Sequence, residues 1–504
     1  MNRLVSMKCA GRLLMALVAL ASVLLIASCG SSGNSVVVKG GFTNASLKGT
    51  YSFTVKGYGF NANTLSAANF FIEGGVFTAD GNKNITAGTD DFVEVVANTT
   101  QAFTDTVTGT YAINSDGTGD LTFNFAGGGQ EVYRITLSDT GNLYMEEEDG
   151  GGTSAGSAHL QTSTTTPNGT FVFRTHDVFV SATMGTMAIS AGAVSGSYIM
   201  VQSGTPATGS IGAGGSITAP TDGRGTISYS VNGLAHSAQY YVVSSSKFLL
   251  LDTTPNILSI GLAEQQSAIT FSAASLSGSY AFGSSGETTT SGFVNTVGVF
   301  TTDGTANVTA ANYDSVQDGS VSSNQMTTGT YLIDNSLGKG SGSLTFGGST
   351  RDIWMVSPTR AYFIALNGAN VEDGTIDQQT GTFSNTSLGT QAAFFMDGFD
   401  GNSGSGNGLF KDRVGTLVPS GTDSLGTNYV ASFFDPNPSV LAGGSTSNAF
   451  TGTYSVAGNG RTTTVLNGFT NNVVLYLTTT STGYMLQADS GVNMSGAFTA
   501  QSSQ

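Results

Sequence analysis

The chain has 504 residues and a formal net charge of −16, because 33 Asp and Glu residues face only 17 Lys and Arg residues. Such an acidic chain is a poor candidate for binding nucleic acid or anionic lipid headgroups, so no nucleic-acid partner is expected. Charged residues make up only 10% of the chain, whereas glycine contributes 70 residues. This composition predicts a surface of Ser, Thr, Asn and Gly, and strands joined by tight turns.

The first 28 residues have the parts of an export signal in the expected order. Three basic residues and no acidic residue come first: Arg3, Lys8 and Arg12. An apolar run broken only by Ser22 follows at 13–26, which is short for a membrane-spanning helix and typical of a signal peptide. Two small residues then precede Cys29.

This arrangement resembles the lipobox of bacterial lipoproteins, in which an aliphatic residue and two small residues precede a cysteine. Here the box is Ile26, Ala27, Ser28 and Cys29. The resemblance covers residues 1–29 only, and implies cleavage after Ser28 and acylation of Cys29 by palmitate-type chains that anchor the protein to a membrane. Gly30, where inner-membrane lipoproteins often have Asp, implies the outer membrane. The alternative is an ordinary secretory signal with a chance cysteine.

The processed chain has few covalent means of holding itself together. Residues 29–45 are rich in Gly and Ser and predict a flexible tether. Cys9 leaves with the signal peptide, and Cys29 is the expected lipid site. No other cysteine is present, so disulfides, zinc–thiolate sites and cysteine nucleophiles are excluded.

Four related segments follow the tether. Their opening stretches are LKGTYSF (47–53), PNGTFVF (167–173), LSGSYAF (276–282) and, more weakly, SLGTQAAFF (387–395). A second marker, GVFTADG (75–81), returns as GVFTTDG (298–304). A third is a Gly-Thr-Tyr step within 107–113, 327–333 and 450–456. Related tails close the segments: SAHLQ (157–161), LAEQQ (262–266), DGTIDQQ (373–379) and SGAFTAQ (495–501).

The repeat length indicates separate modules. A period of about 110 residues is far longer than one solenoid turn, and each copy is long enough to bury a core. We therefore predict four tandem β modules, at residues 46–163, 166–270, 275–380 and 385–502.

The first module shows its strands by alternation of apolar and polar residues. YSFTVK (51–56), LTFNF (121–125) and EVYRITLS (131–138) each have a period of two, which predicts a sheet with one buried face. Asp-Gly pairs at 80–81 and 116–117 predict tight hairpins. Eight strands are expected, beginning near Gly49, Ala68, Lys83, Val107, Gly119, Glu131, Asn142 and Ser157.

We expect an all-β protein in which each module is an up-and-down eight-stranded antiparallel barrel, because closure removes exposed sheet edges. The alternative is an immunoglobulin-like sandwich, although the Cys…Trp…Cys spacing is absent. The loose likeness to avidin- and lipocalin-type barrels is architectural and implies no binding residues. Strands that are apolar on both faces are expected to pack one module against the next, or else to fill a large barrel interior: 240–243, 247–251, 360–366 and 473–477.

No residue pattern predicts catalysis or a defined metal site, and loose Ca²⁺ binding by the acidic run 146–149 or by 114–120 is left open. GTSAG (152–156) matches the nucleophile-elbow pattern at Ser154 but lacks the strand–turn–helix context. His159, His176 and His236 have no metal-ligand spacing, and we interpret them as packed or solvated. The acidic run 146–149 is expected to divide between two strand faces, and NSDGTGD (114–120) lacks EF-hand spacing. Trp354 is expected to be a packing residue.

These observations predict an exported, lipid-anchored cell-envelope protein without enzymatic activity and without a cofactor. Its role would be structural, adhesive or interactive, with an envelope protein as one class of partner. One alternative is that one or more barrel modules bind a small apolar ligand or a glycan, and a third hypothesis is an enzyme of the hydrolase type. Whether the protein occupies the periplasmic or the surface face of the outer membrane is left open by the sequence.

Overall fold

The computed structural model describes residues 41–502, apart from 61–67, 97–98, 140, 179, 290–291, 367, 369, 403–408, 436–441 and 467–471. The predicted signal peptide, Cys29 and most of the tether therefore lie outside the described residues. Within the described residues, no helix has both the length and the apolar character that a membrane crossing requires.

The described residues form 32 strands in four closed antiparallel barrels, which confirms the predicted fold class. In each barrel the strands are neighbours in sequence order, and the last strand pairs with the first. The sandwich alternative is wrong, because every sheet closes on itself rather than packing against a second sheet.

The first barrel follows a short 3-10 helix, η1 (Asn44–Ser46). Its strands are β1 (Lys48–Phe60), β2 (Ala68–Asp80), β3 (Asn84–Val96), β4 (Thr99–Ile113), β5 (Thr118–Phe125), β6 (Gln130–Leu137), β7 (Asn142–Glu147) and β8 (Gly152–Leu160). Most expected starting points agree with these bounds. β4 begins well before Val107, because β3 and β4 continue as a long hairpin beyond the region where β4 pairs with β5.

The other three barrels repeat this plan. The second contains β9 (Gly169–Asp177), β10 (Ser181–Ser190), β11 (Ala193–Gln202), β12 (Thr205–Ile217), β13 (Arg224–Val231), β14 (Leu234–Ser244), β15 (Lys247–Asp252) and β16 (Ser259–Gln265). The third contains η2 (Ala273–Ser275), β17 (Ser277–Thr288), β18 (Phe293–Asp303), β19 (Asn307–Gln317), β20 (Ser320–Ile333), β21 (Ser341–Phe346), β22 (Ser349–Ser357), β23 (Arg360–Ala365) and β24 (Asn370–Gln378). The fourth contains η3 (Asn385–Ser387), β25 (Ala392–Asp400), β26 (Leu409–Pro419), β27 (Ser424–Asp435), β28 (Ala442–Val456), β29 (Arg461–Leu466), β30 (Val473–Thr479), β31 (Thr482–Gln487) and β32 (Val492–Ala500).

Side chains fill the barrel interiors. In the first barrel the aromatic rings of Tyr51 and Phe77 stack with centroids 5.4 Å apart, and Phe53 lies 5.6 Å from Phe123. Each of the other barrels has its own cluster of buried apolar residues. An eight-stranded barrel is just wide enough to be filled in this way.

The repeated sequence markers have structural roles. The Tyr454 hydroxyl of the Gly-Thr-Tyr step donates to the carbonyl oxygens of Asn385 and Leu388, both at 2.9 Å. Tyr111 makes the same pair of bonds at η1, and Tyr331 bonds to η2. This tyrosine therefore ties a long outer strand to the 3-10 helix at the barrel entrance.

The GVFTxDG marker is a side-chain-capped turn. Oδ1 of Asp80 accepts the main-chain N–H of Asn84 at 3.0 Å, and Asp303 accepts that of Asn307 at the same distance. Hydrogen bonds from these asparagine side chains hold the pKa of both carboxyl groups below the usual range. Gly81 has a φ of 81°, which explains the glycine of the Asp-Gly pair.

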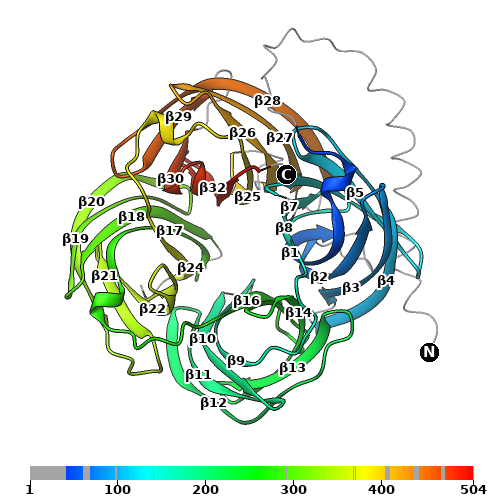
Figure 1. Ribbon diagram of the computed structural model, residues 1–504, viewed down its shortest axis with the longest axis horizontal. Helices are drawn as coiled ribbons and strands as arrows, with labels where there is room; N and C mark the ends of the chain where they lie inside the picture. Colours follow the sequence, from blue (N-terminus) through cyan, green and yellow to red (C-terminus); the bar gives the residue numbers. More distant parts are fainter. Residues whose placement is uncertain are drawn as a thin grey trace.

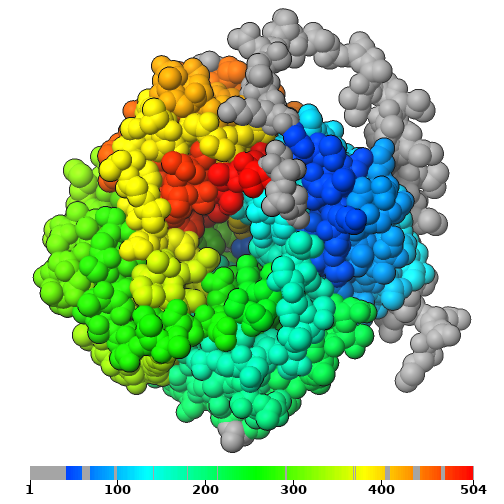
Figure 2. All heavy atoms as spheres, viewed as in Figure 1, coloured from blue at the N-terminus to red at the C-terminus, as the bar shows by residue number. Residues whose placement is uncertain are grey.

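The four barrels lie in a ring (Figure 1), with the last strand of each barrel facing the centre and β4, β12, β20 and β28 on the outside. The middle of the ring is hollowed (Figure 2). Three seams between barrels are apolar, and contain the strands that are apolar on both faces: Tyr241 and Leu251 in the first seam, Tyr362 and Ile364 in the second, and Val474 and Tyr476 in the third. Their predicted role in packing modules together is confirmed.

The first and third seams also share a buried charge arrangement. In each, an arginine of the later barrel forms an ion pair with an aspartate of the earlier barrel, and a tyrosine hydroxyl donates to the same carboxylate. These sets are Asp91, Arg224 and Tyr241, and Asp314, Arg461 and Tyr476. The repetition relates the pair of barrels one and two to the pair three and four.

A repeated glutamine joins each barrel to the next. Its side-chain Nε2 donates to one main-chain carbonyl of the following barrel in every case: Gln161 to Asp222 at 3.3 Å, Gln266 to Lys339 at 2.7 Å, Gln379 to Asn459 at 3.0 Å and Gln501 to Asp116 at 2.9 Å. The residue after each acceptor is a glycine with a φ between 82° and 85°. We call this contact the glutamine latch. Since Gln501 bonds back to the first barrel, the latch that links consecutive barrels also closes the ring.

Candidate functional site

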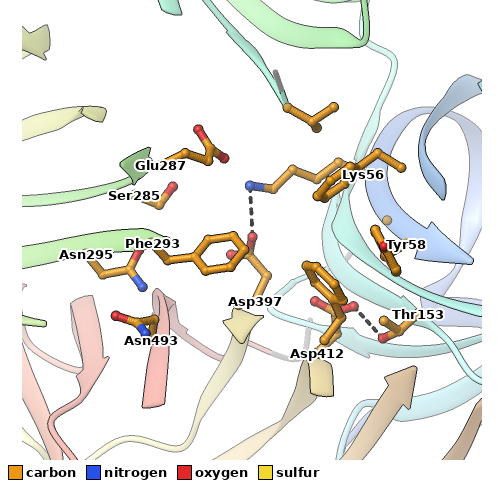
Figure 3. A pocket seen from close by; sticks show the side chains of 16 residues that line it. Lys56, Tyr58, Thr153, Ser285, Glu287, Phe293, Asn295, Asp397, Asp412 and Asn493 are labelled. Atoms are coloured by element: carbon orange, nitrogen blue, oxygen red, sulfur yellow. Dashed lines mark hydrogen bonds and ion pairs between the residues drawn. The ribbon is translucent and has the colours of Figure 1, made fainter. Parts of the chain in front are cut away.

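Four equivalent positions of the modules lie near the centre of the ring, on β1, β9, β17 and β25. They are Lys56, His176, Ser285 and Asp397, which follow Leu47, Pro167, Leu276 and Leu388 of the opening stretches by nine residues in every module. Lys56, Ser285 and Asp397 line a central pocket (Figure 3). His176 bonds to Glu287, another residue of that pocket.

The central pocket is small and mixed in character. Its volume is about 70 Å³, and its lining comes from all four barrels, with Val178 contributed by the second. A water molecule occupies about 30 Å³ of liquid, so the pocket has room for a few waters rather than for a drug-sized ligand.

An ion pair between the first and fourth barrels crosses this pocket. Lys56 Nζ lies 3.0 Å from Asp397 Oδ2, and the two side chains are 29% and 20% exposed. Burial opposes the charged lysine, but the carboxylates of Asp397 and Glu287 outweigh it and raise the pKa of Lys56. Lys56 is therefore a cation at neutral pH, not a free amine nucleophile.

A second charge group joins the second and third barrels. His176 Nδ1 lies 2.6 Å from Asp373 Oδ1, and its Nε2 lies 3.0 Å from Glu287 Oε1. Arg174 Nη1 reaches Asp373 Oδ2 at 2.6 Å. Burial opposes charge on the imidazole, but the two carboxylates raise the pKa of His176 to about 10. His176 and Arg174 in turn hold the pKa of Asp373 below its usual value despite burial.

Two buried carboxyl groups lie at the seam between the fourth and first barrels. Thr153 Oγ1 donates to Asp412 Oδ2 at 2.5 Å and lies 2.6 Å from Ser432 Oγ. Burial and the negative charge of Asp397 raise the pKa of Asp412 to about 8. Burial and the charge of Asp412 likewise raise the pKa of Glu146 well above its usual value. Asp412 is consequently mostly protonated at neutral pH.

Aromatic side chains join three barrels around the pocket. The ring of Phe410 stacks on Tyr58 with centroids 3.9 Å apart, and meets Phe70 edge-on at 5.6 Å. Phe293 of the third barrel lies 6.0 Å from Phe410 and stacks on Phe399 at 5.5 Å. These contacts fix the relative positions of the inner strands.

The charged side chains at the centre of the ring neutralise one another in closed ion pairs. Lys56, His176 and Arg174 pair with Asp397, Glu287 and Asp373. The hydroxyl of Thr153 donates a hydrogen bond to the buried carboxyl group of Asp412. The arrangement holds the four barrels in register.

The motif residues flagged in the sequence lie elsewhere. Ser154 is fully buried and is the third residue of β8, so it is not at a strand–helix turn. Glu146 and Glu147 point to opposite faces of β7, as expected for neighbours in a strand: Glu146 approaches Asp412 across the seam, and Glu147 approaches Tyr133 of the barrel core. Trp354 is fully buried in the second seam and donates to the Lys339 carbonyl at 2.9 Å, which confirms a packing role.

The other two histidines are tied to local partners. His236 Nδ1 lies 2.7 Å from Asp252, and its ring stacks on Tyr229. His159 Nδ1 lies 2.7 Å from Asn142, while Nε2 lies 3.3 Å from both Ser157 Oγ and Lys247 Nζ. Although serine, histidine and asparagine meet there, the lysine competes for the nitrogen that would have to accept the serine proton.

The described residues include no group of three or more His, Cys, Asp or Glu side chains arranged to hold a metal ion. In the NSDGTGD segment, Oδ1 of Asp116 accepts the main-chain N–H of Thr118, and Asp120 pairs with Arg134 at 2.6 Å. Local turn geometry and an ion pair account for both carboxylates.

Sequence reasoning missed the central residues Lys56, Asp397 and Asp412. A usable signal was present, since aligning the opening stretches on their leucine or proline places Lys56, His176, Ser285 and Asp397 at one position. That position can be recognised as part of a site only in the ring, because the ring brings four strand residues that are far apart in the sequence toward one point.

Comparisons with known proteins do not identify a family for the chain: no protein-family model, no curated protein and no solved structure was found to match it. The functional conclusion therefore depends on the sequence features and the ring itself.

Proposed function

We propose that the protein is a non-enzymatic structural or interaction element of the cell envelope, held on the outer membrane through acylated Cys29. In this proposal the four-barrel ring is a rigid body that stands clear of the membrane on the 29–45 tether. Its task is to present surfaces to envelope partners rather than to transform a substrate.

The observation that carries the proposal is the closure of four filled barrels by a repeated latch. A rigid ring results, because each barrel is held by a seam on both sides and by a glutamine bonded to its neighbour. Rigid, multiply presented surfaces suit spacing and multivalent interaction. The central charges support this reading, since each is paired across a seam.

The barrel interiors give little support to the alternative of an apolar ligand within a module. The fourth barrel has an interior pocket of about 30 Å³, next to Arg413 and Phe394, which is room for one or two waters. Ligand pockets in proteins usually measure about 300–1,000 Å³. The outer surface of the ring remains compatible with the binding of a glycan.

The anchor is tested by Cys29→Ala, compared with Cys9→Ala as a matched control, in cells producing the full-length protein. We expect the Cys29 variant to leave the membrane fraction after a carbonate wash, whereas the Cys9 variant stays. Loss of several buried acyl chains removes about 0.8 kcal/mol for each CH₂ group, which is enough to release the protein. Retention of the Cys29 variant in the washed membrane would contradict lipid anchoring.

A further inference from the structure

A large groove lies on the surface at the seam between the third and fourth barrels. Its volume is about 810 Å³, and it is lined by parts of β17 to β20, the end of β24 and the turns at 379–383 and 458–459. This volume is within the usual range for ligand sites. The groove is separate from the central pocket, and no lining residue is shared between them.

The lining residues of this groove carry no charge, although the chain as a whole is strongly acidic. At the same seam, Asp314 and Arg461 form a closed ion pair. A groove of this kind gives no electrostatic attraction to an ionic ligand, and would leave a charged one without a partner.

Side-chain amides line the groove and are held in fixed orientations. Asn459 Nδ2 donates to Asn312 Oδ1 at 3.1 Å, and Asn312 Nδ2 donates to Asn324 Oδ1 at 2.9 Å. Gln379 is fixed by the latch. The side-chain amide of Gln378 has no hydrogen-bond partner among the described residues, so its donor and acceptor are available to a ligand in the groove.

An exposed apolar side chain completes the lining. Met326 is 78% exposed, the most of any large apolar residue in the described chain. Phe383, from the turn that follows β24, is half-buried. A polarizable methionine and an aromatic ring offer a surface for C–H groups, while the amides and threonine hydroxyls offer hydrogen bonds.

Comparison with the first seam indicates that the side-chain amides of the groove are a feature of the third seam. Asp222 stands at the position of Asn459, as TDGR (221–224) aligns with GNGR (458–461) at the latch. Leu160 stands at the position of Gln378, directly before the latch glutamine. The latch thus tolerates a charged or an apolar residue at these positions, and the amides of the third seam are not needed to build it.

We propose that this groove binds a neutral oligosaccharide, with Met326 and Phe383 against the sugar C–H faces and Gln378 and Asn459 bonded to hydroxyl groups. Neutral sugars combine many hydroxyls with apolar ring faces and carry no charge, which matches an uncharged lining of amides, hydroxyls and two apolar side chains. This assignment is independent of the membrane anchor.

The test is titration calorimetry of the full-length protein in detergent against a defined panel of probes. The panel contains neutral linear tetra- to hexasaccharides of glucose, mannose, galactose and N-acetylglucosamine, together with an acidic oligogalacturonate. We expect one neutral series to bind, and the double variant Gln378→Leu/Asn459→Asp to weaken its affinity by about tenfold, because two hydrogen-bonding amides are lost. Met326→Ala is expected to weaken it by about fivefold through lost contact area.

The control variants distinguish a loss of folding from a loss of sugar binding. The two substitutions of the double variant reproduce residues already found at the first seam, so the ring should still fold, and the lost hydrogen bond from Asn459 to Asn312 should lower the melting temperature only slightly. Leu332→Ala removes an exposed apolar side chain from the same strand, β20, outside the groove, and should leave the affinity unchanged. Asp222→Asn, at the first seam, should also leave it unchanged.

Three results would overturn the proposal. The first is that no neutral oligosaccharide binds at concentrations up to about 1 mM, a ΔG of about −4 kcal/mol. The second is binding that survives both the double variant and Met326→Ala, which would place the sugar elsewhere. The third is tighter binding of the acidic oligomer, or of an uncharged Ser/Thr-rich peptide of similar length, than of any neutral sugar.

Discussion

Asp412 is a carboxyl group that the seam between the fourth and first barrels keeps protonated. Its side chain is buried, accepts a hydrogen bond from Thr153 and lies near the charge of Asp397. Ionising Asp412 would add negative charge to a seam that already holds Glu146. The ring closure should therefore depend on pH.

The sign of this dependence follows from the raised pKa. Asp412 titrates near pH 8 when folded and near 3.8 when unfolded, so between these values the folded state binds the extra proton and stability falls as pH rises. His176 acts in the same direction: its contribution is complete below pH 6.5 and is lost as the pH approaches 10. Asp373, with its lowered pKa, contributes stability that is lost only in acid.

We predict that Asp412→Asn flattens the pH profile of unfolding. Each unit of pKa shift corresponds to about 1.4 kcal/mol, so the wild-type protein should lose on the order of 4 kcal/mol more than the variant between pH 5 and pH 8. Urea unfolding at both pH values measures this difference. Parallel profiles for the two proteins would mean that Asp412 is ionised in the folded state.

At the scale of elements, the Gly-Thr-Tyr step determines where the outer strand is held. Tyr454 of β28 reaches η3 with two hydrogen bonds, and the same connection recurs at η1 and η2. Among the described residues, β28 pairs with β27 from Ala442 to Thr453 and with β29 from Gly452 to Val456, and the Tyr454 contact attaches this last part of the strand to η3.

We predict that Tyr454→Phe lowers the free energy of unfolding by about 1–3 kcal/mol, because two buried carbonyl oxygens lose a donor. Tyr313→Phe is the matched control: Tyr313 also packs against its barrel core, and its hydroxyl has no hydrogen-bond partner among the described residues. The control should change stability by less than about 0.5 kcal/mol. Equal losses of stability in both variants would show that the hydroxyl contact of Tyr454 is not responsible for the effect.

At the scale of the whole molecule, the seam between the fourth and first barrels differs from the other three. Consecutive barrels are joined by the chain, whereas this seam is closed only by noncovalent contacts. Gln501 donates to the carbonyls of Asp116 and Leu137, and the next main-chain amide, that of Ser502, donates to the carbonyl of Ser138 at 2.9 Å.

We predict that Gln501→Ala opens the ring at this seam while the barrels stay folded. Two buried carbonyl contacts are lost, at a cost of about 1–3 kcal/mol. Hydrogen exchange should accelerate at β7, β8 and β25, and small-angle scattering should report a larger radius of gyration. Gln379→Ala removes the same latch where the chain still connects the barrels, so it should leave the radius unchanged. An unchanged radius in both variants would show that the seam closes without the latch.

Local patterns predict the strands and turns of each module, and favour a barrel without excluding a sandwich. Alternation in YSFTVK and LTFNF requires strands with one buried face, and Asp-Gly pairs require tight turns, because these preferences depend on neighbouring residues alone. The start of β4 was placed too late, since the segment before Val107 has little apolar alternation and is strand only through pairing with β3.

The repeat of a barrel-forming pattern can thus be read from the sequence itself, and the expected export signal also depends on the sequence alone. The ring, its latch and its central junction were decided by tertiary structure. Lys56 and Asp397 lie 341 positions apart, and neither has a neighbour in the sequence that marks it as part of a site. Their meeting depends on how the apolar outer faces of four barrels pack around a common centre, and such packing leaves no periodic signal in any one segment.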